Sequence, residues 1–278
     1  MGDFNETTAT DLVLARLEGC DDPRLKEIMT SVIRHLHAVV IETEPTEAEW
    51  LAAIQFLTAT GQICDDKRQE YIMLSDTLGV SMLLDAINNR KPETATQSTV
   101  LGPFYVDGAE AMENGANISK DDADGEPLLV SGRVLDLDGE PIAGALLDVW
   151  QATGNGVYDV QDPDREELNL RGKFRSDGDG RFHFNTVTPS SYPLPTDGPV
   201  GQLLARLGRH PYRPAHIHFI VSAEGYGPVT THLFAAGDPY LDSDVVFGVK
   251  DSLVVDFAPR DDGPGRTVDY DFVLSPAG

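Results

Sequence analysis

The spacing of apolar residues changes once along this chain, and that change constrains the fold more than any other feature. Through roughly the first hundred residues, apolar side chains recur every three or four positions, whereas from Leu128 onward they alternate with polar ones. The first spacing is that of an amphipathic helix, and the second is that of a strand with one buried face. The sequence therefore predicts an α+β fold, with a helical N-terminal domain followed by an all-β sandwich.

We expect three parts along the chain. These are a helical domain at 1–97, a connecting segment at 98–126 and a β-sandwich domain at 127–278. The connector carries LGPFY and then a run rich in Gly, Asn and Asp, which is typical of irregular structure. The sequence FRSDGDGRFHF predicts a hairpin that turns between Asp177 and Gly180.

Helix boundaries are marked by capping residues. Asp22 followed by Pro23 predicts one helix start, and Thr46 with Glu49 forms a capping-box pattern ahead of another. A further helical pattern ends near Ile87, and Gly79 divides it into what can be two short helices. The helix after Pro23 has an apolar stripe, which suits packing inside the helical domain or a seam with a second copy of the chain.

Composition excludes some partners and indicates a location. The chain has 21 Lys and Arg against 46 Asp and Glu, a formal net charge of −25, so nucleic acid is not an expected partner. No apolar run reaches the length of a membrane helix, and the acidic N-terminus lacks the pattern of a secretory signal. We expect a cytoplasmic protein, with Cys20 and Cys64 reduced.

The segment RPAHIH is the sharpest chemical feature. It is expected to begin a strand, where residues two apart point to the same side, so His216 and His218 can reach one metal ion. The pair His35 and His37 has the same spacing on a predicted helix, about 200° apart, and cannot chelate. Two ordinary strand-surface histidines remain the alternative for His216 and His218.

The spacing alone does not complete a metal site. A carboxylate would give a two-histidine ferrous centre, and His232 is a candidate third ligand for zinc. Tyr158 and Tyr192 each lie in a loop sequence, where a tyrosine usually serves packing. From the residue types alone, all of these alternatives stay open.

Several ordered motifs together carry a resemblance over nearly the whole chain. GVYDVQ, GKFRSDGDGRFHF, SYPLPTDGPVGQLLARLGRHPYRPAHIHF and GDPYLDSDVVFGVKDSL resemble the intradiol ring-cleavage dioxygenases. The resemblance implies one non-haem Fe(III) ion per chain and no organic cofactor. It places the ligands at Tyr158, Tyr192, His216 and His218. It also implies that Tyr192 is displaced by substrate and that Arg213 stabilises negative charge on the ring.

The resemblance also bears on substrate. The loop SYPLPTDGP, THLF and YLDSDVVFGVKDSL are similar to the subgroup that cleaves hydroxyquinol (benzene-1,2,4-triol) with O2 in aromatic catabolism. A catechol or chlorocatechol substrate is the alternative, and the change of a common TTQ segment to Thr-Thr-His232 argues against plain catechol. Asp76 can accept a hydrogen bond from the third hydroxyl, or it can cap a helix. The implied pocket residues are Met73, Asp76, Leu101, Gly102, Pro103, Phe104, Leu194, Pro195, Val200, Arg213, His232 and Val246.

Members of this family are typically homodimers joined through the helical domain, with a lipid-like molecule at the interface, so both are expected here. Two other classes compete with this interpretation. A prealbumin-like β-sandwich binding module would use neither histidine and would carry no metal. A metal-dependent hydrolase or a ferrous extradiol-type oxygenase could use the same histidine pair.

Overall fold

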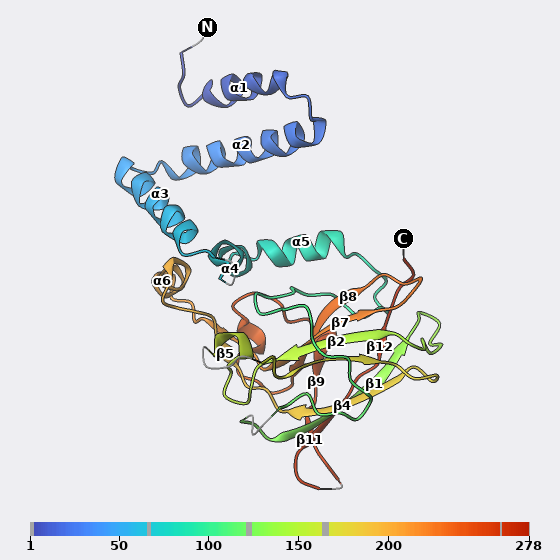
Figure 1. Ribbon diagram of the computed structural model, residues 1–278. Coiled ribbons are helices and arrows are strands. Elements are labelled where there is room, and N and C mark those ends of the chain that lie inside the picture. The colour runs from blue at the N-terminus through green and yellow to red at the C-terminus, as the bar shows by residue number, and fades with distance from the viewer. Residues whose placement is uncertain (1–2, 66–67, 121–123, 163–166, 262, 278) are drawn as a thin grey trace. The chain divides into compact units, whose positions relative to one another are not determined.

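The computed structural model describes residues 3–65, 68–120, 124–162, 167–261 and 263–277 (Figure 1). Two compact units are present, Met1–Ala59 and Thr60–Gly278. The predicted division into 1–97, 98–126 and 127–278 followed the hydrophobic period rather than the packing, and it stays a prediction. Within the described residues, no helix is both long and apolar enough to cross a membrane.

The first unit is helical, and its caps are those predicted. It holds α1 (Ala9–Leu14), a 3-10 turn (Ala15–Gly19), α2 (Pro23–Thr43) and most of α3 (Glu47–Gln62). The Asp22 carboxylate accepts the N–H groups of Arg24 and Leu25 at 2.9 and 3.0 Å. Thr46 and Glu49 bond reciprocally, since Glu49 Oε2 accepts from Thr46 N at 2.8 Å and Thr46 Oγ1 accepts from Glu49 N at 3.3 Å. Both predicted helix starts are confirmed.

The apolar stripe of α2 is not covered by its own unit. None of the residues of this 21-residue helix is fully buried. Leu36 is 61% exposed and Val39 is 56% exposed, and the same stripe includes further exposed apolar side chains. These are Leu25, Ile28, Met29, Val32 and Val40. Packing inside the helical unit therefore does not account for the stripe.

The second unit begins with two short helices, α4 (Glu70–Thr77) and α5 (Val80–Asn88). Gly79 separates them with φ = +75°, a left-handed conformation that favours glycine. The two-helix interpretation is confirmed. Because α4 runs through Thr77 and α5 is capped by Gly79, Asp76 lies in the last turn of a helix, and the prediction that it caps a helix start is wrong.

The β part is a sandwich of two sheets, as predicted. One sheet has the order β10-β11-β1-β12, with β4 also paired to β1, and the other has the order β3-β2-β7-β8-β9. Phenylalanines from both sheets meet between them, with Phe219 of β7 4.8 Å from Phe272 and 6.3 Å from Phe184 by ring centroid. The strands are β1 (Pro127–Leu135), β2 (Leu146–Gln151), β3 (Arg171–Arg175), β4 (Arg181–Val187), β7 (His216–Ser222), β8 (Val229–Ala235), β9 (Val254–Val255), β10 (Ala258–Pro259), β11 (Arg266–Asp269) and β12 (Phe272–Val273).

The predicted hairpin over FRSDGDGRFHF is wrong. The turn is where expected, with Gly180 N donating to Asp177 O at 3.0 Å. However, β3 pairs with β2 and β4 pairs with β1, so the turn connects the two sheets. A tight turn and two alternating strands look alike in sequence whether the strands pair with each other or enter opposite layers of a sandwich.

Candidate metal centre

Three histidines meet on neighbouring strands of one sheet. His216 and His218 lie two residues apart on β7 and so point to the same side, as the alternation predicted. In the β7–β8 ladder His218 lies directly opposite His232, and on the other side it lies opposite Trp150 of β2. The Trp150 indole stacks on the His218 ring at 4.5 Å with an interplanar angle of 14°. The strand register therefore holds the His218 ring between the His232 imidazole, to which it hydrogen-bonds, and the Trp150 indole.

Two tyrosines and an arginine approach from other segments. Tyr158 precedes a 3-10 turn (Asp159–Gln161), where its N–H donates to the Gln161 side chain at 3.0 Å. Tyr192 lies on the two-residue strand β5 (Tyr192–Pro193), which pairs with β6 (Tyr212–Arg213) so that Tyr192 is opposite Arg213. Each of these three side chains is at most 2% exposed.

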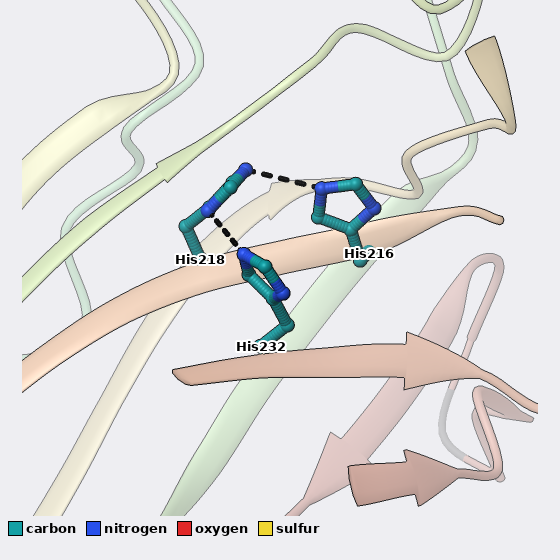
Figure 2. Close-up of side chains that lie close together, drawn as sticks. All are labelled: His216, His218 and His232. Carbon is teal, nitrogen blue, oxygen red and sulfur yellow. Dashed lines mark hydrogen bonds between the residues drawn. The ribbon is translucent and has the colours of Figure 1, made fainter. Parts of the chain in front are cut away.

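The donor atoms converge. Tyr158 Oη lies 2.9 Å from His218 Nε2, 3.4 Å from His216 Nε2 and 3.5 Å from Tyr192 Oη. His216 Nε2 and His218 Nε2 are 3.0 Å apart (Figure 2). Tyr158 is 34 residues from Tyr192 and 60 residues from His218 in the sequence, and the fold brings these side chains together.

Burial controls the charge state of the cluster. It lowers the pKa of His216, His218 and His232 well below the ordinary value, so all three imidazoles are neutral. Burial raises the pKa of both phenols, and for Tyr192 the Arg213 guanidinium counteracts this through its charge and a hydrogen bond. Burial also lowers the pKa of Arg213, but Asp244 and the phenols raise it more, so the guanidinium is charged.

The hydrogen-bond partners of these residues indicate that they fit a metal ion. His216 Nδ1 lies 2.7 Å from the Pro214 carbonyl oxygen, which can only accept, so the single proton of this neutral ring is on Nδ1. His216 Nε2 therefore presents a lone pair toward His218 Nε2 and Tyr158 Oη. Imidazole nitrogens and phenol oxygens are donor types used for transition metals. His216, His218 and His232 form a buried group whose nitrogens, within 4.8 Å of one another, could hold such an ion.

A cavity of about 600 Å³ lies near this cluster and contains part of the predicted pocket. Met73, Pro103, Phe104, Leu194 and Pro195 line it. Phe104 also stacks on the Tyr158 ring at 4.5 Å. A volume of this order suits a small aromatic molecule.

The other predicted pocket residues do not line this cavity. Gly102 (φ +79°) packs against His218, because a Cβ there would stand 3.2 Å from His218 Cε1. Asp76 is buried, which raises the pKa of its carboxyl, and it lies close enough to Arg213 to feel its charge. Leu101, which is 42% exposed, and the buried Val200 and Val246 are not among the residues lining the cavity. His232 hydrogen-bonds to the far side of the His218 ring rather than lining the cavity.

Sequence reasoning missed three supporting residues. Asp244 forms an ion pair with Arg213, Thr99 contacts His232 at 3.2 Å, and Trp150 stacks on His218. The run YLDSDVVFG contains two acids, Asp242 and Asp244, and was a signal for such a partner, since a buried arginine needs a buried partner of opposite charge. Thr99 and Trp150 gave no comparable signal, because both contacts depend on tertiary structure.

Comparison with known proteins gives a consistent result. The family model "Dioxygenase" matches residues 100–276, and "Catechol dioxygenase N terminus" matches 22–96. A hydroxyquinol 1,2-dioxygenase of Rhizobium sp. (strain MTP-10005) is 55% identical over 99% of this chain and 97% of its own length. A 6-chlorohydroxyquinol 1,2-dioxygenase of Cupriavidus pinatubonensis is 52% identical over 99% of both chains. The solved hydroxyquinol 1,2-dioxygenase of Pseudomonas putida DLL-E4 is 50% identical, with a TM-score of 0.93 over 98% of this chain and 99% of its own.

A helical N-terminal region, a β-sandwich with a buried group of potential metal ligands, and two matched family models define the class of this protein, a dioxygenase. Within that class, the chain belongs to the intradiol ring-cleavage dioxygenase family. The resemblance inferred from GVYDVQ, RPAHIH and the accompanying motifs is confirmed. The alternative of a binding module without enzymatic activity is excluded by this membership.

Proposed function

We propose that this enzyme cleaves hydroxyquinol with O2 between its two adjacent hydroxylated carbons. The product is 3-hydroxy-cis,cis-muconate, which tautomerises to maleylacetate. The observation that carries the proposal is the convergence of two phenol oxygens and two imidazole nitrogens near a cavity that is lined in part by apolar side chains. The choice of hydroxyquinol is supported by relatives of that name at 46 to 55% identity over nearly the full chain.

The proposed ligands are Tyr158, Tyr192, His216 and His218, holding one Fe(III) ion. Ferric iron is a hard ion that favours anionic oxygen donors, and two phenolates with two neutral imidazoles leave one net positive charge. When bound, iron would supply the Lewis acidity and the redox activity that the reaction of a diol with O2 needs. Binding requires both phenols to lose their protons, which burial alone opposes.

The two phenols have different surroundings, and this supports different roles. Tyr158 lies at 0% exposure with its ring stacked on Phe104, whereas for Tyr192 the positive charge of Arg213 is the largest of the effects that lower the pKa of the phenol. A group that exchanges a proton with substrate needs both charge states accessible. We assign Tyr192 Oη as the acceptor of one proton from the substrate hydroxyls.

Arg213 is the proposed electrostatic catalyst. Its Nη1 lies 3.3 Å from His216 Nε2, at the edge of the donor cluster, and its guanidinium is held by Asp244. A fixed, buried positive charge stabilises negative charge that develops on the substrate oxygens, and it needs no reorganisation to do so. Asp76, buried near Arg213, is proposed to accept a hydrogen bond from the third hydroxyl of the triol.

Oxygen uptake by iron-loaded protein tests the proposal. Hydroxyquinol, catechol and a chlorinated triol would be compared, with product identification and an enzyme-free control for autoxidation of the triol. Stoichiometric uptake with maleylacetate from hydroxyquinol, and little uptake with catechol, is the expected result. A preference for catechol would overturn the substrate assignment, and no uptake with any diol would overturn the function.

We also propose that the exposed stripe of α2 contacts a second copy of this chain. The apolar side chains run the length of a 21-residue helix and include Leu36 and Val39. Large contiguous apolar surfaces on a protein are commonly interaction sites, and a symmetric dimer covers the same patch on both copies. A lipid-like molecule held in the same interface would appear in the mass spectrum of an organic extract of the purified dimer.

A further inference from the structure

A chain of hydrogen bonds lies behind His218, on the side away from the proposed metal. His218 Nδ1 is 2.6 Å from His232 Nε2, and His232 Nδ1 is 3.2 Å from Thr99 Oγ1. Figure 2 shows His218 between His216 and His232, with one ring nitrogen toward each. His232 is 0% exposed and Thr99 is 3% exposed, so water does not compete for these contacts.

This series of hydrogen bonds admits two arrangements of protons, because each neutral imidazole carries one N–H and threonine can donate or accept. In the first, His218 Nδ1–H donates to His232 Nε2, and His232 Nδ1–H donates to Thr99 Oγ1. His218 Nε2 then presents a lone pair toward His216 Nε2 and Tyr158 Oη, where a metal ion would bind. In the second, every proton is reversed, and His218 Nε2–H points at His216 and Tyr158, where it would block a metal ion.

His216 has no such choice, since its Nδ1 faces the Pro214 carbonyl oxygen at 2.7 Å. The competence of the cluster therefore depends on His218. Both nitrogens of His232 are engaged, one by His218 and the other by Thr99, so this histidine supports a ligand instead of serving as one.

We propose that His232, backed by Thr99, is a positioning residue that accepts the His218 Nδ1–H and so orients this ring when its Nε2 is directed at the metal. The proposal rests on the ligand set proposed above. Such outer partners orient a ligating imidazole and increase its basicity, and their loss typically weakens metal binding about 10- to 100-fold. It assigns His232 a role distinct from substrate contact.

Iron affinity, measured by competition with a chelator, tests the proposal without relying on turnover. His232→Leu is expected to weaken iron binding about 10- to 100-fold. His232→Gln is expected to restore most of the affinity, because the amide oxygen can accept the His218 Nδ1–H. Thr99→Val, which retains His232, is expected to weaken binding about fivefold, the equivalent of one ordinary hydrogen bond.

A matched control and a direct readout complete the experiment. His183→Leu removes an exposed imidazole from β4 of the same sandwich and should leave iron affinity unchanged. Nitrogen-15 NMR of histidine-labelled protein loaded with diamagnetic Ga(III) should place protons on Nδ1 of both His218 and His232. Folding of each variant is checked by circular dichroism, and Thr99→Val and His232→Gln keep the test valid if His232→Leu does not fold.

The outcomes distinguish this positioning role from the proposed iron site and reaction on which it rests. Unaltered iron affinity in His232→Leu and Thr99→Val, or a proton on His232 Nε2, would overturn the positioning role while the proposed reaction stands. Wild-type protein that takes up no iron would overturn both.

Discussion

Asp244→Asn tests how Arg213 is held beside the donor cluster. Each carboxylate oxygen of Asp244 accepts two N–H groups. Oδ1 accepts from Arg213 Nε at 3.1 Å and Val246 N at 3.3 Å, and Oδ2 accepts from Arg213 Nη2 at 3.3 Å and Gly248 N at 2.9 Å. An asparagine in either orientation would place its own NH2 donor against two of these donors.

The cost follows from burial. The side chains of Arg213 and Asp244 are each 2% exposed, so water cannot replace the lost partner. Removing one member of a buried ion pair costs about 3–5 kcal/mol of unfolding free energy. At about 2–4 °C per kcal/mol for a unit of this size, the melting temperature should fall by roughly 6–20 °C. The kcat/KM for hydroxyquinol should also fall, because Arg213 loses its fixed orientation.

Asp271→Asn is the matched control. Asp271 pairs with Arg133 at 2.6 Å, but the two side chains are 32% and 46% exposed. Exposed pairs contribute about 0–1 kcal/mol, so this variant should unfold nearly as the wild type does. Urea denaturation followed by tryptophan fluorescence measures both variants. Equal losses of stability in the two would refute the argument that burial of the pair sets its contribution.

Four further predictions address the buried histidines, the phenols, the pocket and the dimer. Folding lowers the pKa of three histidines, so the unfolded chain binds more protons than the folded one below pH 6.5. The free energy of unfolding of the metal-free protein should therefore fall by up to about 4 kcal/mol for each pH unit of acidification, as measured by urea titration. An equal slope in His232→Gln would contradict this. Tyr158→Phe should lose iron or shift the visible phenolate-to-iron band, whereas Tyr192→Phe should retain some iron but lose turnover; normal turnover in Tyr192→Phe is incompatible with its assigned role. Asp76→Ala should reduce the hydroxyquinol-to-catechol ratio of kcat/KM about 10- to 100-fold, as loss of a hydrogen bond to a charged group does, and an unchanged ratio would end that hypothesis. Leu36→Glu should convert a dimer to monomer in sedimentation analysis, while a dimer that survives would place the interface elsewhere.

Much of the fold could be predicted because local physics determines it. The caps at Asp22 and Thr46 and the break at Gly79 act through hydrogen bonds and backbone conformation within a few residues. The alternation of apolar residues predicts strands but does not determine which strands pair, which is why the hairpin predicted at Asp177 to Gly180 is wrong. An apolar stripe likewise predicts a buried face on α2 without saying what buries it.

The candidate site divides in the same way. His216 and His218 could be recognised as a pair because strand geometry alone puts them on one side. Tyr158 and Tyr192 could be predicted as ligands only from the family resemblance, since no spacing rule links a loop tyrosine to a strand 24 or more residues away. The partnership of His218 with His232 depends on β7–β8 register, which is settled by packing over the whole sheet.

The way each donor is held bears on how the site can work. Tyr158 is fixed by a turn bonded through Gln161 and by the adjoining Asp159, whose carboxylate forms a buried ion pair with Arg171. His216 and His218 lie on a strand paired on both sides. Tyr192, by contrast, is held by a two-residue ladder to β6. Few backbone hydrogen bonds need to break for such a segment to shift, so the fold keeps three donors in place and leaves the fourth comparatively free. A phenol on a short, weakly paired strand, beside a buried guanidinium, is consistent with the proton transfer from an incoming diol that we propose for Tyr192.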